Sequence, residues 1–283
     1  MKKISIIGGS GFLGESLANF CSRKKLDFVI LDLNEPKIFQ DKFSKFNVCD
    51  KDNSDLIEGD VIINLAAEHR DDVKPLSKYS EVNIGGAKNI CAIAEKNGIS
   101  TIVFTSSVAV YGFADKNTGE DGKVRPFNEY GATKAEAEKI YLDWYKKNPE
   151  KRKLIIIRPT AIFGKNNRGN IYNLFKQINS GFFLMIGSGK NVKSIAYVEN
   201  VAEFILHSLG LSSGSYLFNY VDKPDLNMNE LVRFIRNTLG KGENSYFKVP
   251  LIIAMIFGYF FDFMSLFLKK TLPISSIRIK KFC

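Results

Sequence analysis

The segment IIGGSGFLG, residues 6–14, constrains the fold more than any other part of this 283-residue chain. Four glycines follow a short apolar run that begins at Lys3, and a stretch with helical spacing comes directly after them. Gly8, Gly11 and Gly14 have the spacing in which one glycine permits a tight turn, one a close approach to the backbone, and one close packing of a helix. The pattern therefore predicts a strand that turns at once into a helix.

Apolar runs rich in β-branched residues alternate with helical stretches through the first two thirds of the chain. This alternation predicts an α/β fold, a Rossmann-type doubly wound parallel sheet covered by helices. After about residue 165 the strand runs become shorter, which predicts a Rossmann domain over residues 1–165 and a smaller C-terminal substrate lobe over residues 166–283. The predicted strands are residues 3–7, 28–33, 60–66, 100–107 and 153–159, and the predicted helices are residues 12–25, 82–98 and 129–147.

The context of the glycine turn indicates a dinucleotide. A helix N-terminus beside such a turn favours phosphate, because free backbone N–H groups and the helix dipole both attract an anion. Asp32 ends the second predicted strand, where its carboxylate would bond ribose hydroxyls and repel a 2′-phosphate, so NAD is the predicted cofactor. A structural glycine turn with an unrelated surface aspartate is the alternative. The residues of the turn predicted to contact NAD are Gly8, Gly11, Phe12, Leu13 and Gly14.

A second group of residues suits proton transfer. Tyr130 and Lys134 are four residues apart and so lie on one face of a predicted helix. The pKa of a phenol is about 10, and a nearby ammonium with the positive nicotinamide ring is expected to lower it toward the working pH. Tyr130 would then take a proton from a sugar hydroxyl as hydride leaves the same carbon. Ser107 ends a predicted strand at the edge where ligands bind in such sheets, and its hydroxyl is expected to bond the same oxygen.

These motifs together resemble the extended short-chain dehydrogenase/reductase family, in its sugar epimerase and dehydratase branch. The resemblance rests on the glycine turn, NLAA (64–67), SSVAVYG (106–112), YGATK (130–134) and RPTAIFG (158–164), and it extends over essentially the whole chain. It implies that Tyr130 is the base, that Lys134 holds the nicotinamide ribose and that Ser107 positions the substrate oxygen. The further cofactor contacts that it implies are Leu65, Ala66 and Ala67 in the cleft, with Asn47 and Val48 beside the adenine.

The residues after Ser107 discriminate among the reactions of that branch. Its 4,6-dehydratases carry Asp-Glu there, because elimination of water needs a second acid and base, and the related decarboxylases also carry a carboxylate. This chain has Val108 and Ala109. The remaining reaction is 4-epimerisation, in which C4 is oxidised, the ketosugar rotates and hydride returns to the opposite face. A simple alcohol dehydrogenase would use the same residues.

Four longer segments resemble bacterial 4-epimerases that act on N-acetylglucosaminyl-diphospho-undecaprenol. They are residues 65–73, 158–178, 220–232 and 275–283. The resemblance implies an isomerase that interconverts GlcNAc and GalNAc on undecaprenyl diphosphate, in lipopolysaccharide O-antigen or other surface-polysaccharide biosynthesis, at the cytoplasmic face of the inner membrane. A soluble UDP-GlcNAc or UDP-glucose 4-epimerase and a non-catalytic NAD-binding scaffold are the alternatives.

Two departures from the UDP-sugar enzymes favour the lipid-linked substrate. Ala161 stands where those enzymes carry Asn, and Lys193 replaces their usual Arg. Lysine meets a phosphate as a point charge and lacks the two-pronged geometry of arginine. The candidate substrate contacts are Arg70, Arg168 and Lys193, and a solvated charge cluster with Asp71 and Asp72 is the alternative for Arg70.

Residues 250–268 form an almost uncharged apolar segment with helical spacing. Gly258, Asp262, Ser265 and Lys269 fall on one stripe of the helix, and large apolar side chains cover the rest. A transmembrane span, a helix buried in the substrate lobe and a helix lying in the membrane interface are the three interpretations. In the third, the basic residues near anionic headgroups are Lys269, Lys270, Arg278, Lys280 and Lys281.

Composition limits which partners, metal sites and cellular compartment are expected for this chain. The net charge of +10 suits anionic partners, but the lysines are dispersed and lack an aromatic-basic motif, so nucleic-acid binding is not expected. Four scattered cysteines and two histidines make a metal site improbable and indicate a reducing compartment, the cytoplasm. A homo-oligomer is compatible with the sequence, which does not determine the number of subunits. The chain stops at Cys283, where relatives of this kind continue for a few helices, and a naturally short C-terminus and a truncation are the two alternatives.

Overall fold

The computed structural model describes residues 3–51, 53–70, 73–115, 117–167, 169–181, 183–242, 247–268, 275–277 and 279. The chain divides into two compact units, residues 1–166 with 196–221 and residues 167–195 with 222–283. The sequence predicts two domains, each formed by one continuous segment, with a boundary near residue 165. In the structure, residues 196–221 also belong to the first unit. The reason is that β11 (Gly214–Tyr220) pairs in parallel with β6 (Lys153–Pro159) along seven residues.

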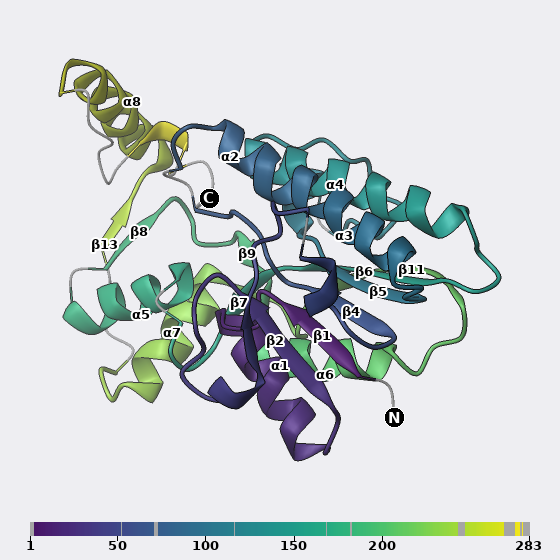
Figure 1. The fold of residues 1–283 in the computed structure, drawn as a ribbon. Helices are drawn as coiled ribbons and strands as arrows, with labels where there is room; N and C mark the ends of the chain where they lie inside the picture. Colours follow the sequence, from purple (N-terminus) through teal and green to yellow (C-terminus); the bar gives the residue numbers. More distant parts are fainter. Residues whose placement is uncertain are drawn as a thin grey trace. The chain divides into compact units, whose positions relative to one another are not determined.

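In the described part of the chain, the first unit is built on a seven-stranded sheet with the order β11-β6-β5-β4-β1-β2-β3 (Figure 1). Every neighbouring pair is parallel. The predicted Rossmann-type α/β fold is therefore confirmed, and each of the five predicted strands is present. The other strands are β1 (Ile4–Ile7), β2 (Phe28–Asp32), β3 (Phe43–Lys45), β4 (Val61–Asn64) and β5 (Thr101–Thr105).

Helices cover both faces of this sheet (Figure 1). One apolar cluster joins α1 (Phe12–Arg23) and α6 (Val198–Ser208) to the sheet, and a second cluster joins α3 (Gly86–Lys96) and α4 (Glu129–Lys146) to it. A strand covered on both faces is apolar at successive positions, which is why the strands read as continuous apolar runs. All seven residues of β6 are buried.

The segment before α3 is not a regular α-helix. The sequence predicts one helix from residue 82, but the structure has a short α2 (Ser77–Tyr79) followed by a π-helical turn, η3 (Ser80–Gly85). π-helical turns are rare and occur frequently at functional sites. Short 3₁₀ helices lie at η1 (Gln40–Lys42), η2 (Ser54–Leu56) and η4 (Val108–Tyr111).

The second unit has its own small core. It contains α5 (Asn170–Ser180), α7 (Met228–Thr238) and α8 (Leu251–Leu268), with the short strands β8 (Leu184–Ile186), β9 (Val192–Lys193), β12 (Leu226–Asn227) and β13 (Phe247–Val249). Strand β13 pairs in parallel with β8, and β12 pairs antiparallel with β9. Ile178, Met185 and Val232 are fully buried between α5, β8 and α7. The remaining ladder joins β7 (Ala161–Phe163), of the first unit, to β10 (Ile195–Tyr197), whose last two residues also belong to the first unit.

Helix α8 has one packed face. A Cβ atom on Gly258 would lie 2.8 Å from Ile279 Cδ1 and 2.9 Å from Ser276 Cα. The Asp262 carboxylate accepts a hydrogen bond from the Ser276 N–H at 3.2 Å. The stripe that the sequence shows as polar is thus a contact face for the segment that follows the helix.

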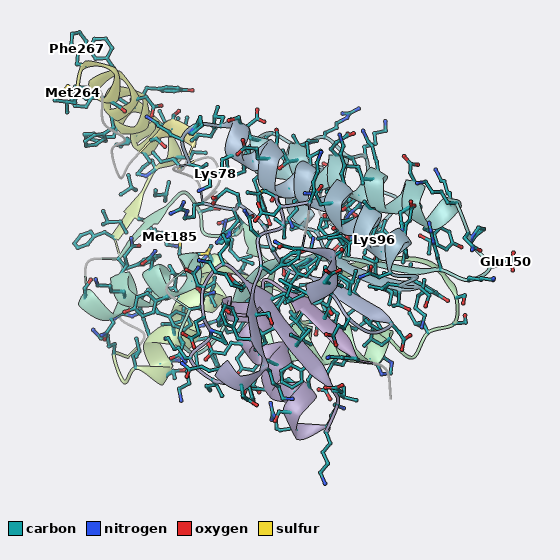
Figure 2. The ribbon with its side chains drawn as sticks, viewed as in Figure 1. Lys78, Lys96, Glu150, Met185, Met264 and Phe267 are labelled. Atoms are coloured by element: carbon teal, nitrogen blue, oxygen red, sulfur yellow. The ribbon has the colours of Figure 1, made fainter. Side chains whose placement is uncertain are left out.

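The opposite side of α8 is exposed and apolar. Ile252 is 75% exposed and Phe267 is 72% exposed, so the interpretation of a helix buried in the lobe is wrong. Phe267 and Met264 lie toward the end of the helix that is remote from β13 (Figure 2). Among the described residues, no helix is both long enough and apolar enough to cross a bilayer. The basic residues predicted to flank α8 all lie outside the described part of the chain.

Candidate active site

The turn between β1 and α1 brings backbone segments unusually close together. Gly8 has a φ of +77°, and a Cβ atom there would lie 2.6 Å from Ala66 N. A Cβ atom on Gly14 would lie 2.5 Å from Gly8 O. Real Cβ atoms do not approach backbone atoms this closely, so both positions require glycine.

The N-terminus of α1 is free to bind an anion. Gly11 occupies the N-cap position and supplies no side-chain hydrogen bond to the first turn. Phe12 and Leu13 begin the helix. The buried Ser10 Oγ has no hydrogen-bond partner among the described residues. The turn therefore presents backbone donors and one hydroxyl group.

Asp32 lies at the mouth of this turn. Its carboxylate accepts hydrogen bonds from Ser10 N and from Asn34 N, both at 3.1 Å. The Phe46 N–H donates to Asp32 O at 2.8 Å, which brings the next segment of the chain beside it. Asn47 and Val48, in that segment, therefore lie near the end of β2. Val48 is buried, and the Asn47 amide donates to Asp50 Oδ1 at 3.0 Å.

Leu65, Ala66 and Ala67 follow β4 and lie against the glycine turn. Leu65 N donates to Ile7 O at 2.8 Å, and Ala66 N donates to Asn64 Oδ1 at 3.1 Å. The structure thus gathers the cofactor residues predicted from three separate segments at one edge of the sheet.

Ser107, Tyr130 and Lys134 are brought together at the end of β5. The side chain of Ser107 lies close enough to that of Tyr130 to act on its pKa. The Lys134 ammonium donates to Thr105 O at 2.8 Å, and its Nζ lies 4.6 Å from the centre of the Phe104 ring. Lys134 is almost fully buried, with 2% of its surface exposed.

Burial controls the protonation of both residues. It raises the pKa of Tyr130 above its ordinary value, and the interaction with the Ser107 side chain offsets only part of that rise. Burial also lowers the pKa of Lys134 to about 7, against the opposing charge of Glu138. The residues of the chain alone therefore do not lower the pKa of Tyr130 as the sequence led us to expect.

The predicted substrate contacts have different surroundings. Arg70 is exposed and its Nε donates to the buried Glu68 at Oε1, at 3.3 Å. Asp71 and Asp72, the alternative partners, lie outside the described residues. Lys193 is half-buried on β9, in the second unit, where its backbone pairs with Leu226. Arg168 lies outside the described residues.

Sequence reasoning missed Asn83, in the π-helical turn. Its amide donates to Thr133 Oγ1 at 2.9 Å and to Glu68 O at 3.1 Å, and its oxygen accepts from Glu68 N at 3.0 Å. Asn83 thereby fastens the loop after β4 to the helix that carries Tyr130. The signal in the sequence was an asparagine within a stretch of otherwise apolar helical spacing.

The sequence pattern of the NAD dependent epimerase/dehydratase family matches residues 4–216. The chain belongs to this family. It is 46% identical to the N-acetyl-alpha-D-glucosaminyl-diphospho-ditrans,octacis-undecaprenol 4-epimerase of Escherichia coli O157:H7, over 99% of this chain and 85% of that protein. It is 27% identical to the UDP-glucose 4-epimerase of Vibrio cholerae, over 92% of this chain and 82% of that protein.

Solved structures of epimerases have the same fold. The UDP-glucuronic acid 4-epimerase from Bacillus cereus in complex with NAD aligns with a TM-score of 0.75 and 18% identity, over 88% of this chain and 87% of that one. The UDP-N-acetylglucosamine 4-epimerase from Methanobrevibacter ruminantium aligns with a TM-score of 0.74 and 22% identity, over 88% and 84%.

The residues present fit NAD, the cofactor of the family. The uncapped start of α1 and the unpartnered Ser10 hydroxyl suit a pyrophosphate, and Asp32 suits an unphosphorylated ribose. In the part of the chain that the structure describes, no group of three or more His, Cys, Asp or Glu residues is placed to hold a metal ion.

We expect Gly14→Ala to weaken NAD binding by at least about tenfold, because the new methyl group would meet Gly8 O and force the turn open. Calorimetric titration with NAD measures this. Gly85→Ala is the control, since a Cβ atom there meets nothing closer than Ser80 O at 3.8 Å. Equal affinity in Gly14→Ala and the wild type would contradict this account of the turn.

We also expect Lys134 to make the stability of the unliganded protein depend on pH. The pKa of Lys134 is about 7 in the folded chain and near its ordinary value of 10.5 in the unfolded chain, so between these values the unfolded chain holds the additional proton. Relative to Lys134→Met, the free energy of unfolding of the wild type should rise as the pH is raised from about 7 toward 10. Denaturant unfolding of both proteins at about pH 6 and about pH 9 measures this difference. A difference that does not change with pH would show that Lys134 titrates normally.

Proposed function

We propose that this chain is an NAD-dependent 4-epimerase that interconverts GlcNAc and GalNAc on undecaprenyl diphosphate. The observation that carries the proposal is its 46% identity, over 99% of its length, to an epimerase whose name states this kind of substrate. The grouping of Ser107, Tyr130 and Lys134 at the end of β5 supplies the chemistry.

Within this proposal, Tyr130 is the residue that moves the proton. As a phenolate, Tyr130 takes the proton of the sugar C4 hydroxyl as the carbonyl forms, and the resulting phenol returns a proton when the new alcohol is made. NAD, held at the glycine turn and Asp32, would supply a reversible hydride acceptor for C4 of the sugar. Ser107, whose side chain lies close enough to Tyr130 to act on its pKa, orients the same oxygen. The Lys134 ammonium is fixed by Thr105 O and provides a buried donor for the cofactor ribose.

The residues after Ser107 support epimerisation over dehydration. Val108 and Ala109 form the first part of η4, and Ala109 N donates to Ser107 Oγ at 3.1 Å. The turn that follows the serine thus supplies a backbone donor and apolar side chains. It has no carboxylate to remove a second proton from the sugar.

We further propose that α8 docks the enzyme on an anionic bilayer. Its exposed face is far more apolar than the surface of a typical soluble protein. Each large side chain on it would gain roughly 1.5 to 3 kcal/mol on leaving water, so this face favours a nonpolar partner. Those exposed by more than half are Ile252, Ile256, Phe257, Tyr259, Phe260, Phe263, Phe267 and Leu268. The chain carries a net charge of +10, which suits anionic lipid headgroups.

A lipid bilayer is the occupant that this face fits best. Gly258 and Asp262 lie on the packed face of α8, where they contact Ser276 and Ile279. The exposed apolar face is on the opposite side of the helix. A helix of this kind lies parallel to the membrane with its apolar side roughly 5 to 10 Å into the headgroup boundary. The proposed substrate, with its polyprenyl chain in the bilayer, would be met at the same surface.

Separate incubations with GlcNAc-diphospho-undecaprenol in detergent and with UDP-GlcNAc test the substrate. We expect conversion of the lipid-linked sugar, and we expect Tyr130→Phe to lose at least about a hundredfold in kcat because the general base is removed. NAD binding by Tyr130→Phe should be unchanged, which separates loss of chemistry from loss of fold. Conversion of UDP-GlcNAc alone would identify a soluble nucleotide-sugar epimerase. Turnover of neither substrate, with NAD bound, would indicate a scaffold.

Sedimentation with vesicles tests the docking surface. The double variant Phe260→Asp, Phe263→Asp should lose at least about tenfold in affinity for vesicles of phosphatidylglycerol and phosphatidylethanolamine, because two charges would enter the apolar layer. Phe234→Asp, at a phenylalanine of α7 that is 65% exposed, is the matched control. Unchanged sedimentation of the double variant would refute docking through α8, and self-association of the wild type without vesicles would identify a second copy as the occupant.

A further inference from the structure

A buried ion pair lies behind the helix that carries Tyr130. Arg158, on β6, donates from Nε to Glu138 Oε1 at 2.9 Å and from Nη2 to Glu138 Oε2 at 2.6 Å. Arg158 is 4% exposed and Glu138 is 8% exposed. This two-pronged geometry fixes the relative position of the two side chains in both distance and orientation.

Glu138 belongs to the same helix as the proposed reacting residues. It lies one turn beyond Lys134 and two turns beyond Tyr130 on α4. Residues at this spacing share one face of a helix. The ion pair therefore fastens the face of α4 that carries Tyr130 to strand β6 of the sheet.

The remaining nitrogen of Arg158 reaches the turn that begins at Ser107. Nη1 donates to the hydroxyl of Tyr111, the last residue of η4, and the guanidinium carbon lies 4.8 Å from the centre of the Tyr111 ring. The Tyr111 hydroxyl in turn donates to Asn219 Oδ1 at 2.8 Å, on β11. One buried guanidinium thus holds α4, η4 and the sheet together.

The same helix and turn also touch beside the reacting residues. A Cβ atom on Gly131, the neighbour of Tyr130, would lie 2.5 Å from Ala109 O in η4. At this contact the backbones of the helix and the turn approach each other directly. Because Ser107 begins this turn and Tyr130 lies on this helix, a relative shift of α4 and η4 would change the distance between their side chains.

Stability alone does not account for a buried charged pair at this place. Replacement of buried ion pairs by packed apolar residues is often neutral or stabilising, because both charges lose their hydration on folding. What such a pair adds is a defined geometry. Here that geometry concerns the two elements that carry Ser107 and Tyr130.

We propose that Tyr111, Arg158 and Glu138 form a positioning network that holds the Ser107 turn against the Tyr130 helix in the reactive arrangement. None of the three touches substrate or cofactor in this proposal, and each acts through Ser107 and Tyr130. The proposal rests on the epimerase function proposed above. It adds that the rate of the chemical step depends on residues behind the site.

Tyr111→Phe is the sharpest test, because it removes one hydroxyl and keeps the ring. We expect kcat, normalised to the number of NAD-binding sites, to fall by about 10- to 100-fold, as misplacement of reacting groups does, while KM and NAD affinity change less than about twofold. Tyr145→Phe, the same substitution at a half-buried position of α4, is the control and should keep the wild-type kcat. An unchanged kcat in Tyr111→Phe would overturn the proposal, as would a loss that appears only as fewer NAD-binding sites.

Arg158→Lys tests the geometry of the guanidinium. It keeps the positive charge and loses the two-pronged contact, so we expect kcat to fall at least as far as in Tyr111→Phe. Wild-type kcat in Arg158→Lys would show that charge alone suffices and would refute the network.

A crystal structure of Tyr111→Phe decides the question without turnover. Relative to a crystal structure of the wild type, a longer distance between the Ser107 and Tyr130 hydroxyl oxygens would support the network, and an unchanged distance would refute it. If the wild type turns over neither sugar, the proposed function is wrong. The comparison of the two crystal structures still tests the positioning network, because it does not depend on turnover.

Discussion

The parallel pairing of β1, β4 and β5 is the constraint on which the rest of this structure depends. Ile7 pairs with Asn64, and Asn64 pairs with Phe104, so three strands that are distant in sequence end side by side. The carboxyl ends of parallel strands share one edge of the sheet, and ligands bind in the crevice at that edge. Both faces of the sheet are covered by helices, which leaves this edge as the place where polar side chains gather.

The polar contacts at this edge hold backbone segments in place. Asn64 accepts a hydrogen bond from Ala66 N and donates one to the Tyr141 hydroxyl, and Asn83 joins the loop after β4 to α4. Lys134 reaches back to the end of β5. Each of these side chains is buried, and each satisfies a polar group that would otherwise lose its contact with water. These buried side chains fix the backbone around the site, and that backbone in turn positions the functional side chains.

Electrostatics at the site follows from the same burial. A lysine without surrounding water is less easily charged and a tyrosine without it is less easily ionised, so the pKa of Lys134 falls and that of Tyr130 rises. The chain alone thus keeps the Tyr130 phenol protonated at neutral pH and leaves Lys134 only partly charged. A bound cofactor with a positive ring would change that balance for Tyr130, which couples proton transfer to the presence of the oxidised cofactor.

The sequence by itself determined the sheet, the glycine turn and the helix of Tyr130, because these depend on local spacing: apolar runs for buried strands, glycines for a tight turn, and four residues between two side chains on one helical face. It missed β3 and β11, since a three-residue strand and an edge strand interrupted by polar residues lack a continuous apolar run. It did not separate a buried α8 from an exposed one, because composition is the same in both cases. Only the tertiary structure decided that residues 196–221 return to the first unit, that Arg158 joins Glu138 to Tyr111, and that α8 packs through Gly258 and Asp262. Those facts depend on which distant segments meet, and no local pattern encodes that meeting.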